Sequence, residues 1–354
     1  MNAKERREKI EAIDKKLIAL VNRRSRLAAI PTAGKGNRAA GYSPAAEEKT
    51  LRRVGRLNPG PLDDRVLRNV YREILSAGRS LAGPLRIAYL GPEATFTHAA
   101  AREKFGAGAE YIPSESIAGV FRDVETSAVE FGVVPIENSL EGAVTYTLDM
   151  LLDSPLQVCS EIFLRVSHCL LSNSPLPEIK VVYSHPQVFG QCRGFIQQQL
   201  AGVELREAAS TARAAELAAA GQKTGALAGK LAAAIYGLKI RRRNIEDSAG
   251  NITRFLVIGK RASPPSGRDR TSLLFSLPHR AGSLHDALNA FKSRGINLTK
   301  IESRPSKKKA WEYYFFVDLE GHRNSKKVKA ALEELESQAK FVKILGSYPV
   351  GEAG

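Results

Sequence analysis

The spacing of apolar and polar positions changes twice along this chain, and each pattern occupies its own segment. Over residues 1–80 apolar residues recur at helical spacing, and over 85–260 short strand-like runs alternate with helical runs. From 272 to 346 the pattern predicts a strand, a helix, two strands, a helix and a strand. Gly83-Pro84 and the stretch ASPPSGRDR (262–270) separate these segments. We therefore predict a multidomain α + α/β + α+β chain, divided into 1–83, 85–261, a linker over 262–269, and 270–349.

The first segment has a helical seam that an arginine interrupts. Arg24 occupies a seam position, and by helical geometry Arg7 and Lys35 fall within about 20° of the same face. Three cations on the inward side of a bundle indicate a buried site for a polyanion. The alternative is that Arg24 snorkels, or pairs with a glutamate of a partner helix. The apolar seam residues are Ile10, Ile13, Leu17, Leu20 and Leu27.

Two stretches of this segment, REKIEAIDKKLIALVNRR (7–24) and YSPAAEEKTLRRV (42–54), resemble the all-helical chorismate mutase domain. The rearrangement of chorismate needs a site that holds a dicarboxylate and places a cation at the breaking ether oxygen. The resemblance implies that Arg7 and Arg24 bind the carboxylates and that Lys35 faces the ether oxygen. Glu47 matches a further site position.

Several positions depart from the chorismate mutase pattern. Pro31 interrupts what should be a continuous helix between Arg24 and Lys35. The family usually has aspartate, arginine, serine and glutamine where this chain has Ser43, Ala46, Gly78 and Ala82. We therefore predict that mutase activity is weak or absent and that the helices remain a dimerisation module. A fully bifunctional enzyme is the alternative.

In the second segment, polar residues follow the predicted strands and open the next helices. Free N–H groups and the dipole at a helix N-terminus favour a bound carboxylate. Several such termini on an α/β scaffold predict a cleft for an anion, although for any one turn ordinary N-capping is the better explanation. The candidate substrate-binding residues at these turns are Thr95, Thr97, Ser184, Gln187, Ser210 and Thr211.

Four polar motifs occur in one order: GPEATFT (91–97), VVPIENSLEG (133–142), YSHPQVFGQC (183–192) and NITRF (251–255). Together they resemble the prephenate dehydratase family. The resemblance implies two α/β lobes, like a type II periplasmic binding protein, with the site between them. It also implies conversion of prephenate to phenylpyruvate, CO2 and water in phenylalanine biosynthesis. Prephenate and arogenate are not distinguished by these motifs.

The residue types of the motifs suit this reaction, in which a ring hydroxyl and a ring carboxylate leave together. We expect Arg254 to anchor the pyruvyl carboxylate and Thr253 to donate a hydrogen bond to the leaving hydroxyl. Glu137 is the expected proton source, because a partly apolar cleft favours a protonated carboxyl group. Phe255, Asn138 and Ser139 complete the expected catalytic set.

The third segment resembles the ACT regulatory domain through RAGSLHDAL (280–288) and NLTKIESRP (297–305). In that family phenylalanine binds between two such domains, so the resemblance implies feedback inhibition and a homodimer or homotetramer. A small domain that only dimerises is the alternative. The expected phenylalanine-site residues are Gly282, Ser283, Leu284, Asn297, Leu298, Glu302, Ser303, Arg304 and Pro305.

Composition excludes some other classes. The formal net charge is +16, and residues 1–83 hold 19 Lys and Arg against 9 Asp and Glu. Tyr42 and Tyr71 are the aromatic residues of that segment, too few for base stacking, so we do not expect nucleic-acid binding. No apolar run reaches the roughly 18 residues that span a bilayer, and the N-terminus resembles no signal peptide, so we expect a cytoplasmic protein.

Cysteine and histidine spacing indicates neither a disulfide framework nor a metal site. The odd number of cysteines, Cys159, Cys169 and Cys192, is typical of reduced structural thiols. No GxGxxG or P-loop spacing is present. We therefore expect no metal and no organic cofactor. A non-enzymatic amino-acid or anion-sensing protein on the same two-lobed fold is the alternative of another class.

Overall fold

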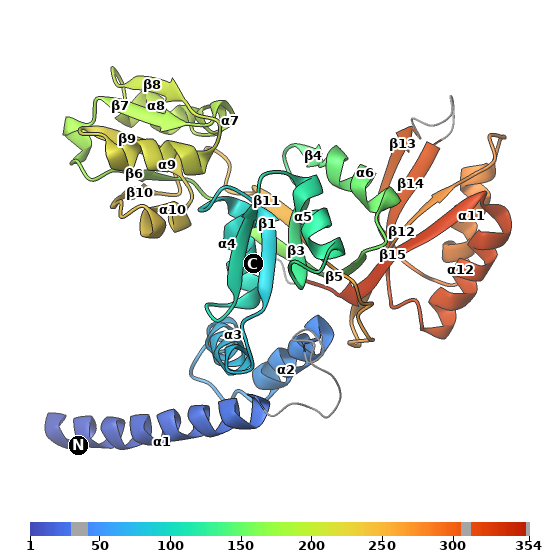
Figure 1. The fold of residues 1–354 in the computed structure, drawn as a ribbon, viewed down its shortest axis with the longest axis horizontal. Coiled ribbons are helices and arrows are strands. Elements are labelled where there is room, and N and C mark those ends of the chain that lie inside the picture. Colours follow the sequence, from blue (N-terminus) through green and yellow to red (C-terminus); the bar gives the residue numbers. More distant parts are fainter. Residues whose placement is uncertain (30–41, 306–312, 352–354) are drawn as a thin grey trace.

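The computed structural model describes residues 1–29, 42–305 and 313–351. Its elements form a helical block, a central two-lobed α/β unit and a C-terminal α+β unit (Figure 1). The predicted fold class is therefore confirmed.

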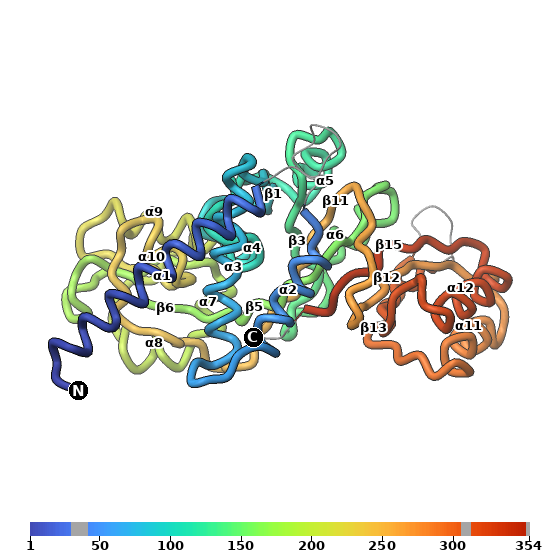
Figure 2. The backbone as a smooth tube through the Cα atoms, turned by 90° about the horizontal axis from the view of Figure 1, so that it is seen from below, coloured from blue at the N-terminus to red at the C-terminus, as the bar shows by residue number. Residues whose placement is uncertain are grey.

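The helical block projects from the centre of the molecule. α1 packs against α3 near its C-terminal end, while residues 3–20 of α1 are exposed and extend away from the other helices (Figure 1). Seen from below, α1 crosses in front of the central α/β unit (Figure 2). The five apolar seam residues between Ile10 and Leu27 are therefore 51% to 64% exposed. The prediction that this seam faces the inside of a bundle is wrong for a single chain. The helices are α1 (Ala3–Ala29), α2 (Pro44–Arg56) and α3 (Asp64–Ser80).

The first lobe is a mixed sheet with strand order β2-β1-β3-β11-β5. β1 runs parallel to β2 and β3, whereas β11 lies antiparallel between β3 and β5. The strands are β1 (Arg86–Leu90), β2 (Glu110–Ser114), β3 (Phe131–Asn138), β4 (Gly142–Ala143), β5 (Gln157–Arg165) and β11 (Ile252–Gly259). The helices are α4 (Phe96–Phe105), α5 (Ile117–Glu125) and α6 (Thr145–Asp153).

The second lobe is formed by the chain between β5 and β11. Its sheet has the order β10-β6-β9-β7-β8, and an alanine-rich core lies between α9 and β9. The strands are β6 (Cys169–Leu171), β7 (Val181–Ser184), β8 (Glu204–Glu207), β9 (Thr224–Ala228) and β10 (Ile240–Arg243). The helices are α7 (Pro186–Gln191), α8 (Arg193–Gln199), α9 (Thr211–Ala220) and α10 (Lys230–Ile235), with a 3-10 turn over Leu176–Glu178.

The C-terminal unit has the predicted βαββαβ order, with the sheet arranged β13-β14-β12-β15. Its two helices enclose an apolar core with one face of the sheet. The other face joins the core of the first lobe, where Leu274, Phe316 and Tyr348 pack with Leu148 and Leu256. The elements are β12 (Asp269–Ser276), α11 (Ser283–Lys292), β13 (Leu298–Pro305), β14 (Tyr313–Glu320), α12 (Lys326–Gln338) and β15 (Phe341–Pro349).

Within the described part of the chain, no helix combines the length and apolar character needed to cross a membrane. Cys159, Cys169 and Cys192 are buried and form no disulfide. Burial raises the pKa of Cys159 and of Cys192 to about 12, which keeps these thiols protonated and unreactive. The three cysteines are thus free and buried, which agrees with the prediction of structural thiols.

Candidate active site between the two lobes

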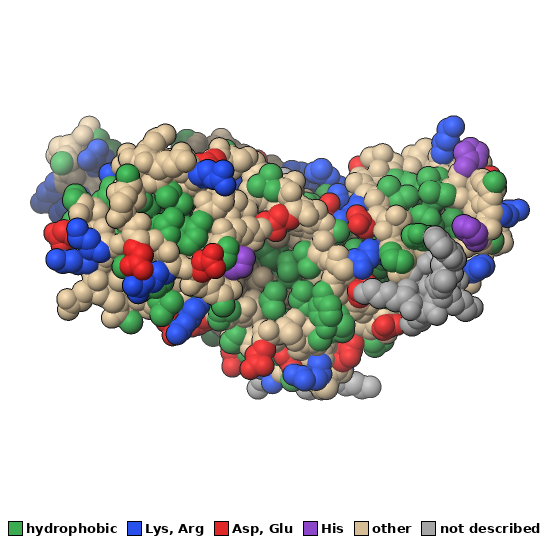
Figure 3. Space-filling view, turned by 90° about the horizontal axis from the view of Figure 1, so that it is seen from above, with side chains coloured by type: hydrophobic (Ala, Val, Ile, Leu, Met, Phe, Trp, Pro, Cys, Tyr) green, Lys and Arg blue, Asp and Glu red, His purple; other side chains and the backbone are tan. Residues whose placement is uncertain are grey.

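The two lobes are joined by two chain segments that are hydrogen-bonded to each other. The Val166 amide donates to the Asn251 carbonyl at 2.8 Å, and the Ile245 amide donates to the His168 carbonyl at 3.1 Å. The His168 amide also donates to the Glu246 carboxylate at 2.9 Å. The surface is hollowed between the lobes, with apolar side chains beside the hollow (Figure 3). Side chains near these crossings are thus positioned at the floor of a cleft.

Thr253 and Asn138 form the centre of this floor. They are opposite residues of β11 and β3, and the Asn138 Nδ2 donates to the Thr253 Oγ1 at 2.8 Å. The same amide donates to Asn251 Oδ1 at 2.7 Å, while its oxygen accepts from the Leu140 amide at 3.0 Å. These bonds determine the orientation of the amide group. The Thr253 hydroxyl accepts this bond, and no acceptor for its own proton occurs among the described residues.

Ser139 holds the second crossing segment in place. Its Oγ donates to the Gly250 carbonyl at 3.0 Å and accepts from the Ile252 amide at 2.9 Å. Both hydrogen-bonding functions of this hydroxyl are therefore used by the backbone. Ser139 thus lies beside the expected catalytic residues, and its hydroxyl supports the backbone segment from Gly250 to Ile252.

The second lobe contributes Gln191, which the sequence analysis did not single out. Its amide nitrogen lies 3.4 Å from Glu141 Oε1 of the first lobe, and its oxygen lies 3.0 Å from His168 Nε2. Burial lowers the pKa of His168 despite the opposing effects of Gln191 and Glu246, so the imidazole is neutral and donates through Nε2. Gln191 lies in the third dehydratase-like motif. Its position in that motif, at the end of a short helix, is the sequence feature that could have identified it as a site residue.

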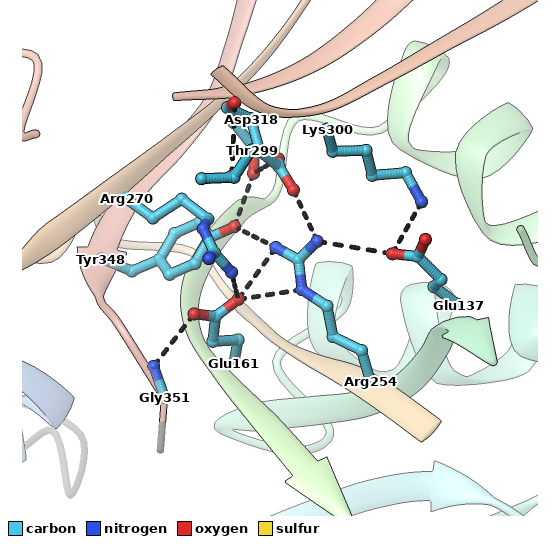
Figure 4. A network of polar contacts seen from close by, with 10 residues as sticks. Glu137, Glu161, Arg254, Arg270, Thr299, Lys300, Asp318, Tyr348 and Gly351 are labelled. Atoms are coloured by element: carbon cyan, nitrogen blue, oxygen red, sulfur yellow. Dashed lines mark hydrogen bonds and ion pairs between the residues drawn. The ribbon is translucent and has the colours of Figure 1, made fainter. Parts of the chain in front are cut away.

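Arg254 and Glu137 lie on the opposite face of the same strands. They are register partners one position beyond Thr253 and Asn138, and successive residues of a strand point to opposite faces. The Arg254 guanidinium contacts Glu161 at 2.8 Å and Asp318 at 2.5 Å (Figure 4). Burial tends to lower the pKa of Arg254, but Tyr348, Asp318 and Glu161 outweigh it and raise that pKa. The guanidinium is therefore charged and already engaged.

This arrangement corrects three predictions. Arg254 does not point into the cleft, so it is not placed to anchor a substrate carboxylate. Glu137 is ion-paired with Lys300 at 2.9 Å and does not face Thr253, so the expected proton relay between them is wrong. Phe255 shares the face of Thr253 but is 1% exposed, so it supports the cleft floor from within the core and forms no exposed wall.

The residues expected at helix N-termini act mainly as caps. The Thr95 and Ser210 hydroxyls accept from the His98 and Arg213 amides at 3.3 and 3.0 Å. Ser184 is fully buried and donates to the Leu227 carbonyl at 2.8 Å, so its expected contact with substrate is wrong. Thr97 is buried, and Thr211 and Gln187 open α9 and α7.

Three family models match successive parts of the chain. Chorismate mutase type II matches residues 6–82, prephenate dehydratase 87–263 and the ACT domain 271–337. The bifunctional chorismate mutase/prephenate dehydratase of Aquifex aeolicus is 45% identical, with 98% of this chain and 97% of that protein covered. That of Pseudomonas aeruginosa is 41% identical, with 97% and 96% covered.

The chain belongs to the bifunctional chorismate mutase/prephenate dehydratase family. It is therefore an enzyme with dehydratase and mutase domains and a C-terminal ACT domain.

Solved structures agree with this assignment over the dehydratase and ACT parts. Prephenate dehydratase of Arthrobacter aurescens in complex with L-Phe is 31% identical, with a TM-score of 0.69, and the match covers 76% of this chain and 90% of that one. GqqA, described as a quorum quenching acylase, is 33% identical with a TM-score of 0.70, covering 75% and 98%. Because one fold carries two described activities, the reaction must be decided at the site itself.

In the mutase domain the predicted cations are far apart. Arg7 is exposed on the free part of α1, whereas Arg24 is half-buried beside α3. A separation of 17 residues corresponds to about 25 Å along a helix. The Arg24 Nη1 is buried without a hydrogen-bond partner among the described residues. Glu47 is buried and pairs with Arg79, and Lys35 lies outside the described residues.

One departure from the mutase pattern has a structural role in this chain, and a second is compatible with the packing. The Ser43 hydroxyl caps α2 by accepting from the Ala46 amide at 3.4 Å. Gly78 lies where α3 meets α1, and a Cβ atom there would be 3.6 Å from Ser25. Serine at 43 thus caps the start of α2. A side chain at position 78 would make an ordinary van der Waals contact with Ser25, so the packing does not require glycine there. Nothing in the structure explains Ala46 or Ala82.

In the ACT domain, the two expected parts of the phenylalanine site surround one core. Gly282 precedes α11 with a φ of 83°, a left-handed conformation that suits glycine. Ser283 is buried and its Oγ has no hydrogen-bond partner among the described residues. Leu284 and Leu298 pack against the same apolar cluster. On β13, Glu302 and Arg304 are half-buried while Ser303 and Pro305 are exposed, and the Asn297 carbonyl accepts from Glu320.

No group of three or more His, Cys, Asp or Glu side chains that could hold a metal occurs in the part of the chain that the structure describes. The expected absence of a cofactor stays a prediction for chelator experiments.

Proposed function

We propose that this chain converts prephenate to phenylpyruvate, CO2 and water in the cleft between the two lobes. The observation that carries the proposal is the Thr253 hydroxyl, which accepts a hydrogen bond from Asn138 and has its own proton free to donate. As the ring C–O bond breaks, negative charge develops on the departing hydroxyl group. A preoriented donor at that position stabilises the transition state more than the ground state.

The carboxylates of the substrate require other partners than Arg254. α4 begins in the motif GPEATFT (91–97), and α9 begins after the polar turn at Ser210. The first turns of both helices retain backbone N–H groups beyond those that Thr95 and Ser210 cap. We assign the pyruvyl carboxylate to these helix termini, with Thr97 and Thr211 nearby. The ring carboxylate leaves as CO2, so the site must not stabilise its charge strongly.

The test is turnover by the purified full-length protein. Prephenate, arogenate and an N-acyl amide are supplied separately, with and without chelator, and phenylpyruvate formation is followed by absorbance. Prephenate turnover that survives the chelator supports the proposal. Amide hydrolysis without prephenate turnover would instead indicate an acylase, as described for GqqA.

We further propose that phenylalanine inhibits the dehydratase through the ACT domain of an oligomer. The ACT match and the phenylalanine complex of the Arthrobacter relative support this. Titration with phenylalanine of the full-length wild-type protein and of Asn297→Ala, a substitution at an expected phenylalanine-site residue, tests it, because the variant should need more phenylalanine for the same inhibition. The cytoplasmic location and the domain boundaries expected from sequence remain predictions.

Chorismate mutase activity is the second candidate function. The unpartnered Arg24 Nη1 and family membership along the whole chain favour it, against the weak activity predicted from Ala46 and Ala82. Since Arg7 lies about 25 Å from Arg24, a complete site needs Arg7 from a second copy, whose helix would also cover the exposed seam. Mixing Arg7→Ala and Arg24→Ala chains should then restore chorismate turnover that neither variant has alone. A wild-type chorismate rate more than about tenfold below the prephenate rate would support the weak mutase.

A further inference from the structure

The strands that carry Thr253 and Asn138 are held from behind by the ACT domain. Lys300 and Asp318 are opposite residues of β13 and β14, just as Glu137 and Arg254 are opposite residues of β3 and β11. The two pairs meet with complementary charge. Lys300 Nζ lies 2.9 Å from Glu137 Oε2, and Arg254 Nη1 lies 2.5 Å from Asp318 Oδ2 (Figure 4).

Three of the four side chains in these ion pairs are largely shielded from water, whereas Glu137 is 38% exposed. The side chains of Lys300, Asp318 and Arg254 are 12%, 9% and 7% exposed. Among the described residues, Lys300 Nζ has no hydrogen bond of normal geometry, so the charge of Glu137 compensates it directly. Charges in such surroundings interact strongly, and removing one partner leaves the other uncompensated. The positions of Glu137 and Arg254 therefore depend in part on the ACT side chains, with Glu161 of the first lobe also holding Arg254.

We propose that Lys300 and Asp318 are positioning residues of the dehydratase centre. The inference rests on the proposed function, because it assumes that Thr253 acts on the substrate. Glu137 and Arg254 are sequence neighbours of Asn138 and Thr253, so a shift of the rear pair displaces the front pair through the backbone. Displacing a reacting group by about 1 Å lowers a rate by about 100-fold.

The position of Lys300 also connects this contact to ligand binding. Lys300 follows Leu298, an expected phenylalanine-site residue, by two positions on β13. Arg304 of the same strand lies 3.5 Å from Asp149 of α6. A ligand that moves β13 would therefore draw Lys300 away from Glu137 and alter the Thr253 site.

The experiment compares steady-state kinetics of the full-length wild-type enzyme with Lys300→Met, Lys300→Arg and Asp318→Asn. Lys300→Met should lower kcat about 10- to 100-fold with little change in KM, and Lys300→Arg should restore much of the loss. Adding Glu137→Gln to Lys300→Met should cost little more, because the pair is already broken. Saturating phenylalanine should inhibit Lys300→Met far less than wild type. Lys329→Met, an exposed lysine on α12, is the matched control and should keep the wild-type kcat.

The results separate the two proposals. A wild-type kcat in Lys300→Met and Asp318→Asn would overturn the positioning role while leaving the dehydratase assignment intact. Equal losses in Lys300→Arg and Lys300→Met would also overturn it, since the cation would then not matter. Absence of prephenate turnover in the wild-type protein would overturn the proposed function and this inference with it. Thermal unfolding of each variant identifies losses of kcat that are caused by unfolding.

Discussion

Asn138 donates its amide to the hydroxyl of Thr253 at 2.8 Å, so the direction of the hydrogen bond between these two residues is defined. Because an amide NH2 group can only donate, Thr253 must direct its proton elsewhere. The polarity of this one bond thus makes Thr253 a donor toward the cleft.

Reversing this polarity should reduce catalysis. Asn138→Asp is nearly isosteric, but its carboxylate would accept the Thr253 proton and withdraw it from the substrate. Thr253→Ala should lower kcat by about 100- to 1,000-fold with a smaller effect on KM, and Asn138→Asp should approach that loss. Thr253→Ser should retain most activity. Asn173→Asp, on the surface, is the control; wild-type rates in Thr253→Ala would disprove the assigned role.

Arg254 should matter for stability as much as for activity. Arg254→Ala leaves Glu161 and Asp318 buried with fewer cations, which should cost about 3–5 kcal/mol of unfolding free energy. Urea unfolding measures the change. Arg213→Ala removes an exposed arginine paired with Glu216 and should stay within about 0.5 kcal/mol of wild type. If Arg254→Ala raised KM alone with unchanged stability, a carboxylate-anchoring role would be restored.

His98 should make the stability depend on pH in an acidic window. Burial lowers the pKa of His98 to about 4, and Arg102 adds to the effect. As the pH falls, the imidazole is therefore protonated in the unfolded chain at a higher pH than in the folded chain. The folded state loses stability as the pH falls from about 6.5 to about 4. The loss from this group is about 2–3 kcal/mol. Unfolding of His98→Phe, which keeps a ring against Tyr89, should depend less on pH in that window; an unchanged slope would contradict the prediction.

Gly346 should be required for the docking of the ACT domain. A Cβ atom at this position would lie 2.2 Å from the Val158 carbonyl oxygen, which is backbone and has little freedom to move. Gly346→Ala should therefore lower stability by about 1–3 kcal/mol and weaken phenylalanine inhibition. Gly190→Ala in α7 meets nothing within 4 Å and serves as the control. Differential scanning calorimetry should show a lower unfolding temperature for Gly346→Ala than for the wild type and an unchanged one for Gly190→Ala.

Elements with clear boundaries could be predicted from local sequence. The run VVYS followed by His185 and Pro186 identifies the end of β7 and the start of α7, because proline is favoured in the first helical turn. Thr253 could be chosen as a candidate site residue from its motif, NITRF (251–255). The direction of Arg254 could have been deduced in part, since neighbouring strand residues face opposite sides. Its partner Asp318 could not, because 64 residues separate the two and only the packing of the domains brings them together.

The seam of α1 shows a second limit of sequence reasoning. Its apolar spacing correctly predicted a helix, but a pattern does not state whether the covering surface belongs to the same chain. In this chain Leu17 and Leu20 are more than half exposed.

The insertion of β11 between β3 and β5 has a consequence for synthesis on the ribosome. The second lobe has all five of its strands once residue 243 has emerged, so it can close its sheet early. The first lobe cannot, because residues 252–259 supply a strand in the interior of its sheet. Until then β3 and β5 expose unpaired backbone edges, which are sites for wrong pairing. The strand that completes the catalytic floor is thus also the one that ends this exposure, and Thr253 reaches its place when the first lobe becomes protected.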